Sequence, residues 1–120
     1  MIIKPLLAGV SQLVKKPITV EYPDEKEEKP DNYRGVHKLD MQTCISCGAC
    51  ARICPNNTID MVDTETDKGI KKMPQIGLDR CLFCGLCEEV CPTKCLVLTK
   101  STEYEAYDRR VLIKRPEDLE

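Results

Sequence analysis

Residues 44–55 read CISCGACARICP, and residues 81–92 read CLFCGLCEEVCP. In each stretch three cysteines stand three positions apart, a fourth follows four positions later, and a proline comes next. Sliding the chain by 37 residues brings Cys44 onto Cys81 and every other cysteine of the first stretch onto one of the second. This self-similarity indicates an internal duplication. Apolar alternation follows both stretches, so we expect an α+β fold with a duplicated βαβ core of ferredoxin type.

The spacing of these cysteines suits iron-sulfur chemistry. Two-residue gaps make a tight loop that turns three thiolates toward one centre and leaves backbone N–H groups facing it. Bacterial proteins with this spacing bind two 4Fe-4S clusters, and the fourth cysteine of each run ligates the other cluster. The sequence therefore predicts two 4Fe-4S clusters with crossed ligand sets: Cys44, Cys47, Cys50 and Cys91 for cluster 1, and Cys81, Cys84, Cys87 and Cys54 for cluster 2.

Other uses of nine cysteines fit the pattern less well. Zinc ribbons use separated Cys-x2-Cys pairs and have no need of a third cysteine at the same spacing followed by Cys-Pro. Disulfides belong to oxidising compartments, whereas Lys4 and Pro5 interrupt the apolar opening that a secretory signal would need. The ninth cysteine, Cys95, falls where the first half has Thr58. It is interpreted as a small buried hydrophobe, with an alternative ligand or redox thiol left open.

The residues around the motifs suggest how the loops are built and held. Gly48 and Gly85 follow the second cysteine of each run, where we expect a positive φ or close approach to the cluster. His37, the one histidine, lies on a predicted strand, Val36 to Asp40. A role as a ligand or in proton transfer is left open for it, beside a purely structural role. With one Phe and no Trp, apolar burial leaves so small a core marginal, so we expect the apo-protein to be largely unfolded.

Four segments are predicted along the chain. An amphipathic helix spans residues 1–16, an extended proline-containing arm spans 17–35, the two-cluster ferredoxin domain spans 36–99, and a charged tail spans 100–120. A polar stretch, Thr64 to Lys71, is predicted to be the turn between the two halves. The tail offers five candidate anchors: Tyr104, Tyr107, Val111, Leu112 and Ile113.

Charge and hydropathy exclude some partners. A formal charge of -2 and a pI near 5.5 give no basic face for a nucleic-acid backbone, so no nucleic acid is expected. The sequence contains no apolar run of about 18 residues, the length that a membrane-crossing helix needs. We therefore expect any membrane association to be peripheral, through residues 1–16, which could equally pack on a protein partner.

Residues beyond the cysteines carry a more specific resemblance. The run Asp79-Arg80-Cys81-Leu82-Phe83-Cys84-Gly85-Leu86-Cys87-Glu88-Glu89-Val90-Cys91-Pro92-Thr93 is similar to the second motif of the complex I subunit called NuoI or TYKY. The stretches 17–23 (PITVEYP), 33–37 (YRGVH) and 107–119 (YDRRVLIKRPEDL) resemble the arms of that family. Around the first motif, residues 47–57 (CGACARICPNN) look closer to its archaeal branch. That branch includes membrane-bound NiFe hydrogenases, sulfur-reducing complexes and F420H2 dehydrogenases.

The resemblance implies a peripheral electron-transfer subunit at the cytoplasmic side of the cell membrane. Its expected neighbours are a small subunit with a 4Fe-4S cluster, a NiFe-type large subunit and ion-translocating membrane subunits, with a soluble ferredoxin as a candidate donor. Catalysis would belong to those partners. The alternative function is a free soluble two-cluster ferredoxin or the ferredoxin subunit of a soluble 2-oxoacid oxidoreductase. The arms favour the fixed subunit, because a free carrier has little need of them.

Overall fold

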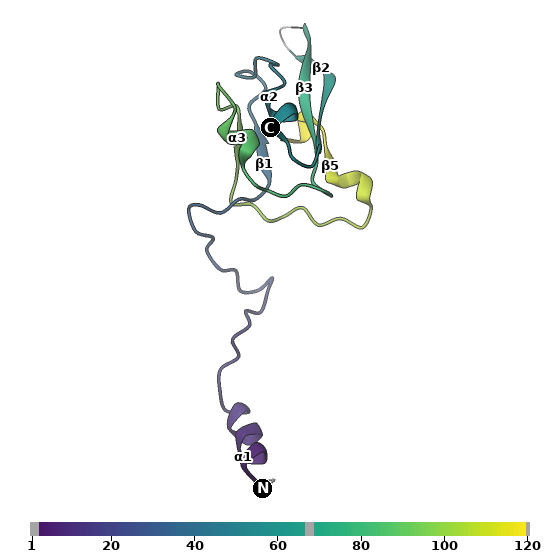
Figure 1. Ribbon diagram of the computed structural model, residues 1–120. Coiled ribbons are helices and arrows are strands. Elements are labelled where there is room, and N and C mark those ends of the chain that lie inside the picture. Colours follow the sequence, from purple (N-terminus) through teal and green to yellow (C-terminus); the bar gives the residue numbers. More distant parts are fainter. Residues whose placement is uncertain (1–2, 67–68, 120) are drawn as a thin grey trace.

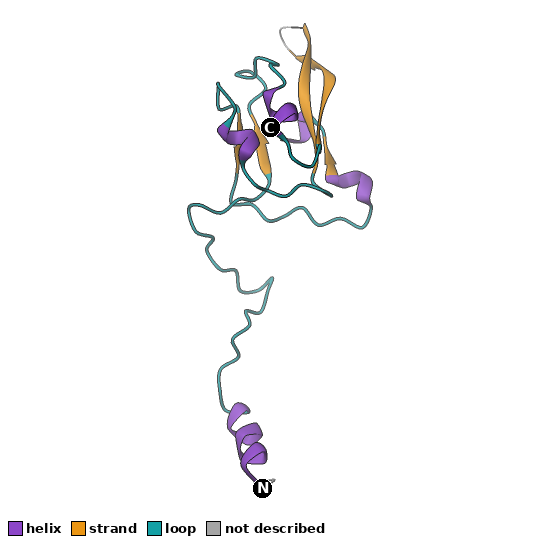
Figure 2. Ribbon diagram, viewed as in Figure 1, coloured by secondary structure: helices purple, strands orange, loops and turns teal. Residues whose placement is uncertain are grey.

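The computed structural model describes residues 3–66 and 69–119. Figures 1 and 2 show a small body of short strands and helices, from which a thin arm leads to a separate N-terminal helix. The predicted α+β fold of ferredoxin type is confirmed. In chain order the elements are α1 (Ile3–Gln12), β1 (His37–Leu39), α2 (Ala49–Ile53), β2 (Ile59–Thr66), β3 (Gly69–Gly77), α3 (Leu86–Glu89), β4 (Leu96–Leu98), the 3-10 turn η1 (Arg109–Leu112), β5 (Ile113–Lys114) and the 3-10 turn η2 (Pro116–Leu119).

The strands form two small antiparallel sheets. One sheet pairs β1 with β4, and the other has the order β2-β3-β5. In the first sheet His37 lies opposite Leu98, and in the second Pro74 lies opposite Met61. The 37-residue offset that aligns the two cysteine stretches also carries His37 to position 74 and Met61 to position 98. Positions 37 and 74 therefore occupy equivalent places in the two sheets.

The connection between the halves is a long hairpin. The chain reverses within the predicted turn, Thr64 to Lys71, but that predicted turn is too long, because β2 continues through Thr66 and β3 begins at Gly69. Positions 67–68 of that predicted turn lie outside the described residues. A two-stranded ribbon tolerates polar side chains on both faces once it extends beyond the core. Hydrogen bonding supports this one, because the hydroxyl of Thr66 donates to the carbonyl of Gly69 at 2.7 Å.

The apolar core is small and lies between the two sheets. Its largest fully buried side chains come from both sheets and from the C-terminal turn: Leu39, Met73, Pro74, Ile76, Leu96 and Pro116. Two of the motif cysteines, Cys44 and Cys87, belong to the same buried cluster. These two thiols therefore lie at the edge of the core, where a group bound to them would be in contact with the buried apolar side chains.

The C-terminal tail packs on the domain by only some of the residues predicted, among them Leu112 and Tyr104, whose ring lies 5.4 Å from that of Phe83. Tyr107 is fully exposed, and Val111 and Ile113 are exposed as well. Leu112 does pack against the core. The main anchor is Leu119, which is 2% exposed and which no periodicity marked out. The tail is thus held at its far end, by an apolar residue in a short turn.

The N-terminal arm is joined to the rest of the chain by backbone hydrogen bonds where it approaches β1. The amide of Gly35 donates to the carbonyl of Thr99 at 2.7 Å, and a Cβ at this glycine would collide with the backbone of Ser101. Farther out, surface ion pairs join Lys26 to Glu103 and Lys100 to Asp31. The molecule extends 74 × 25 × 24 Å, and α1 lies at the far end of the long dimension (Figure 1).

Helix α1 has no buried side chain. Its apolar residues stay exposed, as do the two that follow it on the same stripe: Ile3, Leu6, Leu7, Val10, Leu13 and Val14. Helices of folded proteins usually bury an apolar stripe of this kind against a core, and α1 does not do so within the described part of the chain. Among the described residues, no helix is both long and apolar enough to span a bilayer.

Candidate iron-sulfur site

The first cavity lies beside the first cysteine loop. Its thiol lining comprises Cys44, Cys47 and Cys50 from that loop, together with Cys91 and Cys95 from the second half of the chain. Pro74 of β3 and Leu96 of β4 close it from the core side. The space between its lining atoms, open solvent at its mouth included, is about 360 Å³. The four residues predicted for cluster 1 are therefore all at its wall.

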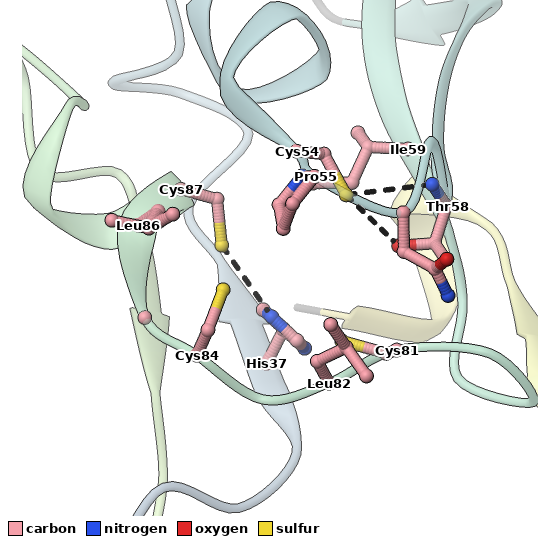
Figure 3. Close-up of a pocket in the computed structure, with 12 residues that line it drawn as sticks. His37, Cys54, Pro55, Thr58, Ile59, Cys81, Leu82, Cys84, Leu86 and Cys87 are labelled. Atoms are coloured by element: carbon pink, nitrogen blue, oxygen red, sulfur yellow. Dashed lines mark hydrogen bonds between the residues drawn. The ribbon is translucent and has the colours of Figure 1, made fainter.

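The second cavity is the counterpart on the other loop, and Figure 3 shows its lining. Cys81, Cys84 and Cys87 come from the second loop, and Cys54 reaches it from the end of α2. The space between its lining atoms, measured in the same way, is about 340 Å³, nearly that of the first cavity. The four residues predicted for cluster 2 thus surround one space, and His37 lines it too.

Both cysteine loops use left-handed backbone conformations at matching places. Gly48 and Gly85 have φ of 66° and 84°, so the positive φ predicted for them is confirmed. Ser46 and Phe83 also have positive φ, 58° and 50°, although both carry side chains. Such turns point successive backbone N–H groups inward. One of them, the amide of Phe83, donates to the sulfur of Cys81 at 3.4 Å.

The two crossing cysteines receive local hydrogen bonds. The amide of Thr58 donates to Cys54 at 3.4 Å, and its hydroxyl lies 3.3 Å from the same sulfur. Burial opposes ionisation of Cys54, but these bonds outweigh it and lower the pKa of the thiol. At Cys91 burial is likewise outweighed, by hydrogen bonds from the Leu96 amide and the Cys95 thiol, and the pKa falls to about 7. Both thiols therefore ionise more easily than an ordinary cysteine thiol.

Cys95 occupies the place that Thr58 has in the first half. Its sulfur lies 3.5 Å from Cys91, just as the Thr58 hydroxyl lies close to Cys54. The Cys95 side chain is buried, and burial raises the pKa of its thiol to about 12. A protonated thiol donates to a neighbouring thiolate. The residue therefore does for Cys91 what a threonine hydroxyl does for Cys54.

Replacing Cys95 with Thr tests this equivalence. We expect Cys95→Thr to keep the wild-type iron content and visible spectrum, because a hydroxyl supplies the same donor in a similar volume. The reciprocal variant Thr58→Cys is a matched control and is expected to behave alike. Iron and acid-labile sulfide analysis of the purified proteins checks both. Loss of iron in Cys95→Thr but not in Thr58→Cys would make Cys95 a ligand.

His37 is a site residue that the motif analysis did not place. Its side chain is 3% exposed, and its Nε2 lies 3.6 Å from the sulfur of Cys87 (Figure 3). The ring stacks at 5.8 Å from Phe83, whose other neighbour is Tyr104 at 5.4 Å. A single histidine at the start of a strand gives no sequence signal that it lies beside a cysteine of the second motif. The antiparallel pairing of β1 with β4 brings it to the second loop.

The donor set of each cavity suits a 4Fe-4S cluster. Each cavity has four motif thiols, three from one motif and one from the other, around a space bounded by apolar side chains, and Cys95 adds a fifth thiol to the lining of the first cavity. Backbone amides and hydroxyls point at the sulfurs, which stabilises the negative charge of a thiolate-bound cluster. Among residues 3–66 and 69–119, no three Cys, His, Asp or Glu side chains converge closely enough for one metal ion.

Comparisons with known proteins agree with this chemistry. Residues 43–95 match the family described as the 4Fe-4S dicluster domain. The NAD(P)H-quinone oxidoreductase subunit I of a Synechocystis species is 43% identical over 111 residues, which cover 89% of this chain and 57% of that protein. The same subunit of a Picosynechococcus species is 46% identical over 102 residues, which cover 82% of this chain and 50% of that protein.

Two further proteins match this chain at lower identity. NADH-quinone oxidoreductase subunit I of Carboxydothermus hydrogenoformans is 36% identical over 72 residues, covering 60% of this chain and 51% of the relative. A chain of the membrane-bound sulfane sulfur reductase, an archaeal respiratory membrane complex, superposes with a TM-score of 0.67 at 34% identity, covering 96% of this chain and 62% of that one.

These matches extend beyond the cysteine motifs into the arms. The chain spans about half the length of the curated relatives that it matches. The predicted family resemblance is confirmed, both to the complex I subunit and to an archaeal membrane complex. By sequence and by structure, the chain is similar to subunit I of NAD(P)H-quinone oxidoreductases and to a chain of an archaeal respiratory membrane complex, and its residues 43–95 match the 4Fe-4S dicluster domain.

Proposed function

We propose that the chain is an electron-relay subunit of a membrane-bound, ion-translocating oxidoreductase of the hydrogenase-like or complex I-like type. The observation that carries this proposal is the pair of nearly equal cavities, each walled by four motif thiols, in a homologue of complex I-type subunits. When bound there, a 4Fe-4S cluster accepts and releases single electrons. The protein holds such a cluster, shields it and adjusts its potential; bond chemistry belongs to partner subunits.

We assign two clusters with crossed ligands. Cys44, Cys47, Cys50 and Cys91 hold cluster 1, and Cys81, Cys84, Cys87 and Cys54 hold cluster 2. Membership of each set in one cavity supports the assignment. The order strand, helix, strand occurs twice within residues 37–98, which supports the duplicated βαβ core and a ferredoxin domain at 36–99. Because each set takes one thiol from the other half, each cluster fastens both halves together.

The surroundings of the domain favour a fixed subunit over the alternative of a free soluble ferredoxin. The relatives are subunits of quinone oxidoreductases and a chain of a respiratory membrane complex. In this chain the exposed stripe of α1 is an apolar surface that a free carrier would leave in water. We assign it to a protein partner or the membrane surface at the cytoplasmic side. The partners are a 4Fe-4S small subunit, a NiFe-type large subunit and membrane subunits, and a soluble ferredoxin is the candidate donor.

Extraction from native membranes with a mild detergent tests the subunit assignment. We expect the chain to be purified as part of a large complex that contains membrane subunits. Identification of the largest companion by mass spectrometry then names the catalytic partner. Recovery of the chain alone and monodisperse, with its iron intact, would contradict the assignment and favour the free ferredoxin.

The role of α1 has its own test. Charges introduced by Leu6→Asp and Leu7→Asp lie within the apolar stripe, and we expect them to reduce the membrane-bound fraction several-fold. Iron content should not change, because α1 buries no residue against the domain. The matched control, Ser11→Asp with Gln12→Asp, adds the same charge outside the stripe and should leave the bound fraction near wild type. Equal loss in both variants would contradict a specific role for the stripe.

A further inference from the structure

The two cavities are built by the same duplicated elements, yet they differ at a buried position of the strands. Position 37 lines the second cavity, and position 74 lines the first. The strand register makes these positions equivalent, because His37 pairs with Leu98 and Pro74 pairs with Met61. Histidine brings ring nitrogens to its cavity. Proline has no N–H at all. The duplication therefore leaves one cavity with a side-chain donor that the other lacks.

The geometry of His37 directs one nitrogen at the cysteine loop. Its Nε2 lies 3.6 Å from the sulfur of Cys87, and both side chains are buried. The other nitrogen, Nδ1, is buried without a hydrogen-bond partner in the described part of the chain. Phe83 packs beside the ring and keeps it in place. Nε2 is thus the nitrogen with an acceptor within reach.

The position of the proton follows from the acceptor that Nε2 faces, the sulfur of Cys87. A cysteine that binds iron has lost its proton and only accepts. The contact between His37 and Cys87 can therefore be a hydrogen bond only with the proton on Nε2.

We propose that His37 is a positioning residue that donates an Nε2–H hydrogen bond to the Cys87 thiolate and raises the reduction potential of cluster 2 alone. Hydrogen bonds to cluster sulfurs stabilise the more negative, reduced state. Pro74 leaves cluster 1 without this donor. The proposal deepens the proposed function, on which it rests, by naming a residue that makes the two potentials unequal.

Labelling tests the contact in the wild-type holo-protein. His37 is the only histidine of the chain, so ¹⁵N-histidine labels a single residue. We expect pulsed EPR of the reduced protein to show a ¹⁵N hyperfine coupling on one of two cluster signals. Full iron content with no such coupling on either signal would overturn the proposal and leave the proposed function intact. Absence of iron would instead contradict the proposed function.

Variants test the effect on potential. His37→Phe keeps a ring but removes the donor, and we expect about a tenfold shift of the cluster 2 reduction equilibrium toward the oxidised state, about 59 mV for one electron. His37→Gln retains an N–H and should recover much of that shift. Lys38→Met, an exposed neighbour on β1, is the matched control and should leave both potentials unchanged. Equal potentials in wild type and in iron-replete His37→Phe would overturn the proposal. If neither His37 variant assembles, the labelled wild type decides.

Discussion

Replacing Cys54 with Ala is expected to damage the cluster of the second loop, although Cys54 belongs to the first motif. In the crossed arrangement Cys54 lies at the second cavity with Cys81, Cys84 and Cys87. We expect Cys54→Ala to lose roughly half of its iron and to give the same residual EPR spectrum as Cys81→Ala. The physical reason is that the first cavity retains all four of its thiols, including Cys91.

The comparison variants make this result decisive. Cys91→Ala should share its residual spectrum with Cys44→Ala, because both remove a ligand from the first cavity. Ligand sets that followed the motifs without crossing would give the opposite pairing, with Cys54→Ala matching Cys44→Ala. Cys95→Thr serves as the control for a cysteine at the cavity wall that is not a ligand.

Removing iron is expected to unfold the domain. Among the described residues the buried apolar cluster has only ten members, three of them cysteines. Both cavities are lined by members of this cluster, the first by Leu96 and the second by Ile59. Structural metal sites contribute about 10–16 kcal/mol in zinc-finger peptides, comparable with the entire stability of about 5–15 kcal/mol that is typical of a small domain. We therefore expect chelation to abolish the cooperative thermal transition and most strand signal in far-UV circular dichroism.

A matched comparison separates loss of iron from loss of the arm. A variant that lacks α1 should keep the thermal transition, because no residue of α1 is buried. If the iron-free protein instead retains a native-like spectrum and a cooperative transition, the core is held by apolar packing alone. The role of the clusters in joining the two halves would then be wrong.

The parts of the site that depend on short-range spacing could be predicted from the sequence. Three thiols at three-residue intervals define a loop, and a turn of helix before the proline places Cys54 and Cys91 away from it. The positive φ of Gly48 and Gly85 could be predicted in the same way, because a side chain at these loop positions would crowd the cavity. These features depend on local geometry, so a single sequence reveals them.

Features that depend on tertiary pairing could not be predicted in this way. His37 reaches the second cavity only because β1 pairs with β4, about 60 residues away along the chain. Leu119 enters the core from a short terminal turn that has no hydrophobic period. Thr64 and Lys71 have the composition of a turn, but cross-strand pairing extends both strands through them. In each case long-range contacts override the local preference.

Iron and acid-labile sulfide analysis of the purified chain, combined with an EPR-monitored reductive titration, tests the central claim most directly. The account predicts about eight iron and eight sulfide per chain and two separable 4Fe-4S signals that interact magnetically when both are reduced. About four iron with a single signal would contradict the presence of two clusters. Zinc in place of iron in the natively purified protein would contradict electron relay altogether.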